Sequence, residues 1–266
     1  MLLEFQLIAE LALMGTIAGF LAGLLGIGGG MIMVPFMTMI LEAKGFPAEY
    51  VVKMAVATSL ATICFTSLSS VRAHHKHGAV LWPVARLLAP GIVLGSLLGA
   101  QIAAALPTRI LSLVFALFVA YSATQLFIDR KPKPSRTLPG ASGMLGMGGL
   151  IGLLSSLVGA GGAFVSVPFM TWCNVKIHQA VATSAALGFP IALAGTLGYI
   201  WAGRDLSDMP PGTLGYLYLP GLLVIATLSM STAPLGARTA HRMDIRPLKR
   251  AFAVVLYLLA GYFLMR

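Results

Sequence analysis

Long apolar blocks alternate with short polar or charged connections along the whole chain. Most of the blocks have the roughly 20 residues that an α-helix needs to cross the hydrocarbon core of a bilayer. The pattern therefore predicts an all-α polytopic membrane protein with six to eight helices and no soluble domain. The blocks span residues 7–41, 48–72, 79–106, 108–128, 140–172, 177–203, 213–236 and 246–265.

Two of these blocks are interrupted by glycine clusters. The first block, 7–41, would be roughly 50 Å long as one helix, and it contains the run Gly26-Ile-Gly-Gly-Gly30. Each glycine costs about 1 kcal/mol in helix propensity, so we expect the chain to unwind there. Unwound backbone at membrane depth persists only where protein or a water-filled cavity satisfies its polar groups. The cluster therefore predicts two half-helices that form a re-entrant hairpin beside a pathway.

The interrupted stretch occurs twice, which divides the chain into two repeats. At a constant offset of 133, Gly19–Met37 and Gly152–Met170 share ten of nineteen residues, and each copy is followed by Ala-Val-Ala-Thr-Ser, at 55–59 and 180–184. We therefore expect two pseudo-symmetric units joined by a linker. They are a first transmembrane repeat at 1–128, a basic cytoplasmic linker at 129–139 and a second transmembrane repeat at 140–266.

The distribution of charge predicts how the repeats are oriented. Lysine and arginine gather in the connections at 72–78, 129–136 and 238–250, which the positive-inside rule assigns to the cytoplasm. The amino terminus and the connections near Glu42 and Asp205 are acidic or mixed. The basic connections and the acidic or mixed ones fall on opposite sides of the membrane only if the glycine-interrupted segments do not cross the bilayer. We therefore expect inverted halves, each with a re-entrant hairpin and about three transmembrane helices, and an external amino terminus. Eight full spans in two parallel halves are the alternative.

Composition excludes several classes of protein. Hydrophobic residues make up 58% of the chain and charged residues 10%, with a mean hydropathy of +0.90, so there is too little polar surface for an ordinary soluble fold. The net charge of +10 lies in short connections rather than on one amphipathic face, which argues against a nucleic-acid partner. Cys64 and Cys173 lie far apart, and His74, His75 and His77 belong to a basic loop. We expect no disulfide framework, no metal site and no cofactor.

The acidic residues also limit the function. Proton relays and cation pumps generally place a carboxylate inside the membrane, and intramembrane proteases need paired Asp, HExxH or an activated Ser/His set. The sequence has none of these patterns, so we expect that the protein is not an enzyme. The eight acidic residues all lie at or near block ends, and they are Glu4, Glu10, Glu42, Glu49, Asp129, Asp205, Asp208 and Asp244.

The apolar blocks do contain hydrogen-bond donors. Half-helices starting at Met31 and Phe164 would point the positive ends of their dipoles, with free N–H groups, at the centre of the protein. An anion held between the two breaks is therefore the predicted cargo. The residues expected to bind it are Gly26, Gly28, Gly29, Gly30, Thr58, Ser59, Gly159, Gly161, Gly162, Thr183 and Ser184, with the basic pair Lys53 and His178 in a gating or anion-attracting role.

Each assignment has a simpler alternative. The glycine clusters could form close-packed kinks without touching a ligand, and the hydroxyls could bond helix to helix or bond back to a carbonyl. Lys53 and His178 could extend to the membrane interface. Two further glycine stripes have the four-residue spacing of helix-packing surfaces, and we expect them to pack. They are Gly15, Gly19 and Gly23, and Gly91, Gly95 and Gly99.

The doubled motifs GIGGG…VP and GAGGA…VP, each followed by an Ala-Thr-Ser helix, resemble the sulfite exporter TauE/SafE family, also called the 4-toluene sulfonate uptake permease family. The resemblance extends from about Gly15 to Tyr262. It implies a multi-pass secondary transporter of the cell inner membrane for sulfite, sulfoacetate or another organosulfonate, mostly by export and by alternating access. A passive anion channel is the alternative.

At matched positions the resemblance assigns the functional glycines to both clusters. The second copy has Ala163 where the first has Gly30, so the two halves are not equivalent at this position. The expected partners are a small anionic substrate and the lipid bilayer, and a homodimer is left open as the assembly.

Overall fold

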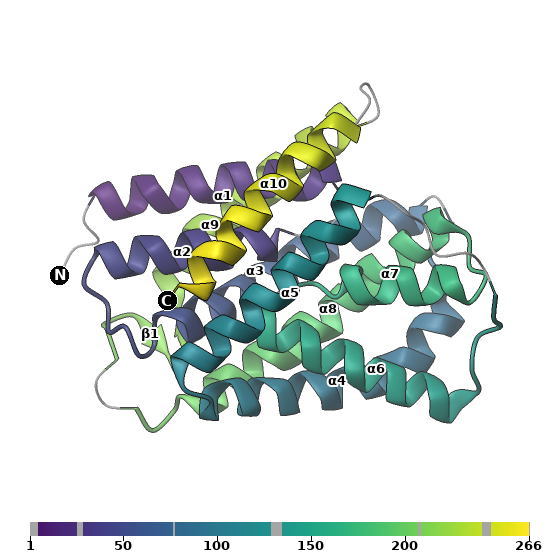
Figure 1. Ribbon diagram of the computed structural model, residues 1–266, viewed down its shortest axis with the longest axis horizontal. Coiled ribbons are helices and arrows are strands. Elements are labelled where there is room, and N and C mark those ends of the chain that lie inside the picture. The colour runs from purple at the N-terminus through teal and green to yellow at the C-terminus, as the bar shows by residue number, and fades with distance from the viewer. Residues whose placement is uncertain are drawn as a thin grey trace.

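The chain folds into ten α-helices and one short β-hairpin in the computed structural model, which describes residues 5–25, 29–76, 78–128, 135–206, 209–240 and 246–265 (Figure 1). The first half contains α1 (Phe5–Leu25), α2 (Gly30–Ala43), α3 (Val51–Lys76), α4 (Trp82–Ala105) and α5 (Thr108–Ile128). The second half contains α6 (Ala141–Val158), α7 (Ala163–Trp172), α8 (Ile177–Ala202), β1 (Thr213–Leu214), β2 (Leu217–Tyr218), α9 (Leu219–Ala240) and α10 (Arg246–Leu264). The helical prediction is confirmed, and the antiparallel hairpin of β1 and β2 is an addition to it.

Most of the helices can cross a membrane. In the described ranges, eight helices are long and apolar enough to do so. The two exceptions are α2, with 14 residues, and α7, with 10, and both are shorter than a full span requires. These two short helices are the ones that follow the glycine clusters.

The helices are interrupted where the sequence predicts. One cluster separates α1 from α2, and the other separates α6 from α7. Gly159 and Gly162 have φ angles of 68° and 79°, in the left-handed region that residues with a side chain rarely adopt. The second interruption therefore depends on its glycines. Gly26 and Gly28 of the first cluster lie outside the described residues, as do positions 129–134 of the linker.

The two halves repeat the same order of helices. In each half a long helix is followed by a short helix that begins at a glycine cluster, and then by three long helices. The third helices, α3 and α8, are both 26 residues long. The hairpin precedes α9 in the second half, at the place where α4 begins in the first.

Glycine stripes join the halves to each other. On α4, Gly91 and Gly95 lie so close to α6 that a Cβ atom at either position would collide with the backbone of Leu145 or Gly149. The stripe on α4 packs against α6, and the stripe on α1 packs against α9. In both pairs the contacts follow the same order along the two helices, so α4 runs parallel to α6 and α1 runs parallel to α9. The predicted packing of the stripes is confirmed. On α1 the stripe Gly15, Gly19 and Gly23 lies against Ile225, Ser229 and Ala233 of α9, in that order.

The connections separate into two ends of the molecule. The ends of α3, α5 and α9 and the starts of α4, α6 and α10 lie toward one end, on the right of Figure 1. The connections after α2, α4 and α8, together with the start of α1 and the end of α10, lie at the other end. The described helix ends that flank the three basic stretches of the sequence are therefore all at one end, which is called the basic end below.

Candidate functional site

The two helix interruptions meet inside the protein, and this contact is the centre of the candidate site. A Cβ atom at Gly30, the first residue of α2, would collide with the carbonyl oxygen of Gly159 in the other half. The hydroxyl of Ser59 on α3 donates a hydrogen bond of 3.0 Å to the same carbonyl. All three residues are buried. The structure thus brings together three residues that the sequence assigns to the site.

The short helices begin beside this contact. Gly29 and Gly162 are their N-cap residues, and neither makes a side-chain capping bond. The two glycine carbonyls accept helical hydrogen bonds of 3.0 Å from the N–H of Met33 and 2.9 Å from the N–H of Ser166. The N–H groups of a first helical turn have no acceptor within their helix, and the helix dipole makes that end positive. Both ends have the chemistry that binds anions.

Ser155 adds a donor that the sequence analysis missed. Its Oγ lies 3.1 Å from the position that a Cβ atom of Gly162 would take. The side chain is 0% exposed and its hydroxyl has no hydrogen-bond partner among the described residues. Aligning the two repeats at the offset of 133 could have identified this serine, because the second copy has Ser155 where the first copy has Ala22.

Ser184, the counterpart of Ser59, makes a different contact. It accepts a hydrogen bond of 2.7 Å from Ser166 of α7, and both side chains are buried. The first copy has Met33 in place of Ser166. Ser155 and Ser166 thus give the second copy hydroxyls at two positions where the first copy has Ala22 and Met33. Gly161 lies in this interruption and is partly exposed.

Thr58 and Thr183 connect the two halves. The Thr58 hydroxyl accepts a hydrogen bond of 3.1 Å from the N–H of Tyr218, just before α9. The Thr183 hydroxyl accepts one of 3.0 Å from the N–H of Leu81, just before α4. Each threonine therefore caps the start of a helix in the other half, and both side chains are buried. This is a packing contact between elements, of the kind that the sequence leaves open as the alternative.

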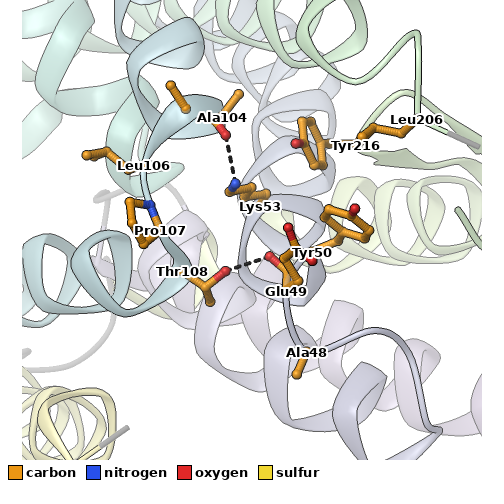
Figure 2. Close-up of a pocket in the computed structure, with 11 residues that line it drawn as sticks. Ala48, Glu49, Tyr50, Lys53, Ala104, Leu106, Pro107, Thr108, Leu206 and Tyr216 are labelled. Carbon is orange, nitrogen blue, oxygen red and sulfur yellow. Dashed lines mark hydrogen bonds between the residues drawn. The ribbon is translucent and has the colours of Figure 1, made fainter. Parts of the chain in front are cut away.

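The two basic residues of the predicted pair have different surroundings. Lys53 is 6% exposed, and its Nζ donates a hydrogen bond of 2.7 Å to the carbonyl of Ala104 (Figure 2). The same Nζ lies 5.7 Å from the ring centre of Tyr216. His178 is exposed near the start of α8, at the basic end. The structure therefore separates the pair and buries only its lysine.

An open cavity of about 670 Å³ lies beside Lys53. Glu49 stands at its rim and interacts electrostatically with the lysine. Burial, and to a smaller extent the charges of Tyr50 and Glu49, raise the pKa of Tyr216 above its ordinary value. The phenol of Tyr216 therefore stays protonated at neutral pH and can donate a hydrogen bond.

Other chemistry is sparse in the described part of the chain. No group of three or more His, Cys, Asp or Glu residues there could hold a metal ion. Cys64 and Cys173 are free thiols. Glu10 pairs with Lys44 over 3.9 Å at the end opposite to the basic end.

Comparison with known proteins shows similarity to membrane transporters. Residues 11–263 match the model of the sulfite exporter TauE/SafE family. The chain is 36% identical to a probable membrane transporter protein of Haemophilus influenzae, over 96% of this chain and 97% of the relative. It is 26% identical to a probable membrane transporter protein of Methanocaldococcus jannaschii, over 99% and 98% of the two chains. A probable membrane transporter protein of Bacillus subtilis is also 26% identical, over 94% of both chains.

Proposed function

The chain belongs to the sulfite exporter TauE/SafE family of membrane transporters, and on that basis we propose that it is a secondary transporter that exports a small sulfur-containing anion. It is a multi-pass protein of the cell inner membrane. The proposed substrate is sulfite or an organosulfonate such as sulfoacetate. These anions offer charged oxygen acceptors, which form stronger hydrogen bonds than neutral acceptors do. We propose no enzymatic activity for the chain.

The contact between Gly30 and Gly159 carries the proposal. It is the meeting point of two interruptions whose short helices begin nearby without side-chain caps. We infer that the anion binds between the interruptions, on the amide groups at the starts of α2 and α7, with Ser155 as an additional donor. The contact leaves no room for a methyl group at Gly30, and we propose that the interruptions separate when the anion passes between them. A separation of this kind favours a carrier over a permanently open channel.

The helix directions support inverted halves. α1 starts at the end opposite to the basic end, whereas its counterpart α6 starts at the basic end (Figure 1). α4 and its counterpart α9 likewise start at opposite ends. We propose that α1–α2 and α6–α7 are re-entrant hairpins, and that the halves expose the site alternately to the two sides.

The distribution of basic connections supports a direction across the membrane. The helix ends that flank them share one end of the molecule, which the positive-inside rule assigns to the cytoplasm. The amino terminus is then external, and an exported anion enters from the basic end and leaves at the end that holds Lys53.

A liposome assay tests this function. The purified protein, reconstituted in proteoliposomes, is expected to exchange radiolabelled sulfite or sulfoacetate for the same unlabelled anion. Counterflow of this kind identifies a carrier, while flux without counterflow would identify a passive channel. Recovery of chemically altered anion would indicate an enzyme.

A matched pair of variants tests the site. In Gly161→Val the new side chain lies at the second interruption, where a Cβ would meet Ile63 at an ordinary 3.7 Å. Transport is expected to be lost although the protein still inserts. Gly146→Val, on α6, is the control, because a Cβ there meets nothing within 4 Å. Full transport by Gly161→Val would contradict the proposed site.

A further inference from the structure

The cavity beside Lys53 has features that a structural lysine alone does not explain. The ammonium is almost completely buried, yet it faces an open cavity of about 670 Å³. A charged side chain is seldom buried without a partner of opposite charge, because removing it from water is costly. Glu49 is exposed, and its carboxylate interacts with the ammonium only over a longer distance. The two described side chains do not form a salt bridge within 4 Å.

The hydrogen bonding of Lys53 leaves donors available. Its bond to the carbonyl of Ala104 lies in the last turn of α4, where a lysine is favourable because carbonyl groups are exposed and the helix dipole is negative. An ammonium has three N–H donors, and this bond uses one. No second hydrogen bond of this ammonium is present in the described part of the chain, and Lys53 lines the cavity. The hydroxyls of Tyr50 and Tyr216 belong to the same cavity lining (Figure 2).

The cavity is built from both halves of the chain. Lys53 comes from α3, and the turn between α4 and α5 forms one wall. Tyr216 of the hairpin and Leu206 come from the second half. Tyr216 also packs against Tyr199 of α8, with ring centres 6.2 Å apart. A movement of one half against the other would therefore change the cavity.

We propose that this cavity is a second anion site, in which Lys53 binds the transported oxyanion at the external end of the molecule. The identity of the anion rests on the proposed function. The ammonium supplies a charge-assisted hydrogen bond, and the protonated phenol of Tyr216 is an additional donor. Glu49 weakens the site, since its negative charge opposes that of the anion and partly neutralises the lysine. The lining of this cavity includes none of the residues of the helix interruptions, and the site is the last one that an exported anion meets.

Binding of radiolabelled sulfite to the purified protein, measured by scintillation proximity, tests this proposal. The wild type is expected to bind two anions per chain. Lys53→Gln should lose one of them, or bind it about tenfold or more weakly, because a charge-assisted bond is removed. Lys53→Arg should retain both. Glu49→Gln should bind the external anion several-fold more tightly, because it removes an opposing charge.

The signs of these changes separate an anion site from a helix cap. If Lys53 only capped α4, Lys53→Gln would lower the unfolding temperature and leave sulfite binding unchanged, and Glu49→Gln would not tighten binding. Unchanged sulfite binding by Lys53→Gln, or no tightening of binding by Glu49→Gln, would overturn the proposal. Lys44→Gln is the control, because it removes the same charge at the same end but outside the cavity, and it should bind both anions normally.

Failure of this inference can be told apart from failure of the proposed function. Gly161→Val should lose the central anion and keep the external one, which is the converse of Lys53→Gln. If Gly161→Val binds two anions and transports normally, the central site is wrong while the external site stands. If Lys53→Gln binds two anions with wild-type affinity, the external site is wrong while the central one stands.

Discussion

The carbonyl oxygen of Gly159 fills the space that a side chain at Gly30 would need. The two residues belong to different halves of the chain, and each lies at a helix interruption. Their contact couples the interruptions directly, so a substitution at one residue is expected to shift the backbone at the other. The predictions below use this contact and the hydrogen bonds around it.

Gly30→Ala should weaken the contact at the centre. The methyl group would collide with a backbone atom, which cannot swing away as a side chain can, so the expected cost is about 1–3 kcal/mol of unfolding free energy. Transport should fall as well. Thermal unfolding in detergent measures the first effect and sulfite counterflow the second. Gly146→Ala, which meets nothing within 4 Å, should not be destabilised, and equal behaviour of the two variants would contradict the contact.

Ser59→Ala should destabilise the second interruption. It removes the hydroxyl that donates to the buried carbonyl of Gly159, and an acceptor left unpaired in this way costs about 1–3 kcal/mol. Chemical or thermal unfolding measures the loss. Ser231→Ala serves as the comparison, because that exposed serine only bonds back to Thr227 within its own helix. The unfolding free energy of Ser231→Ala should stay within about 0.5 kcal/mol of the wild-type value.

Thr58→Val and Thr183→Val should each loosen the connection between the halves. Valine keeps the shape of threonine but leaves the N–H of Tyr218 or of Leu81 without its acceptor. The expected cost is about 1–3 kcal/mol for each variant. The matching Ser variants, which keep the hydroxyl, should be affected much less. If the Val and Ser variants unfold at the same temperature, the hydroxyls do not cap α9 and α4.

Ser155→Ala should separate binding from stability. The hydroxyl has no partner in the described residues, so its removal should leave the unfolding temperature unchanged or raise it. If it donates to the anion, the half-saturating sulfite concentration should rise about tenfold or more, since hydrogen bonds to charged groups are the stronger ones. Ser122→Ala on α5 also removes a buried hydroxyl that has no partner among the residues described, and transport by this variant should be normal. Equal half-saturation in both variants would remove Ser155 from the site.

The interruptions and the glycine stripes could be predicted because their causes are local. A glycine cluster disfavours a helix whatever surrounds it, and glycines four residues apart lie on one helix face. The same reasoning could not show that Gly30 and Gly159 touch. That contact depends on how two halves, far apart in sequence, come together.

The hydroxyl and lysine partners could not be predicted for a similar reason. Thr58 bonds a residue 160 positions away and Thr183 one that is 102 positions away. Lys53 and His178 hold matching positions in the repeat, yet Lys53 lies beside the ring of the hairpin residue Tyr216 whereas His178 is exposed. The β-hairpin that supplies Tyr216 has short strands of two residues each, so the apolar pattern gives no sign of it.

The pairing of α1 with α9 fixes an order of events during synthesis. Ser229 donates a hydrogen bond to the carbonyl of Gly15, which precedes it by 214 residues. At about 5–20 residues per second, α1 leaves the ribosome roughly 10–40 s before its partner is made. Its glycine face must meanwhile be covered by lipid or by an insertion factor. α1 is thus made long before its packing partner can hold it in place, and a chain that ends before α9 would keep the glycine face of α1 uncovered by protein.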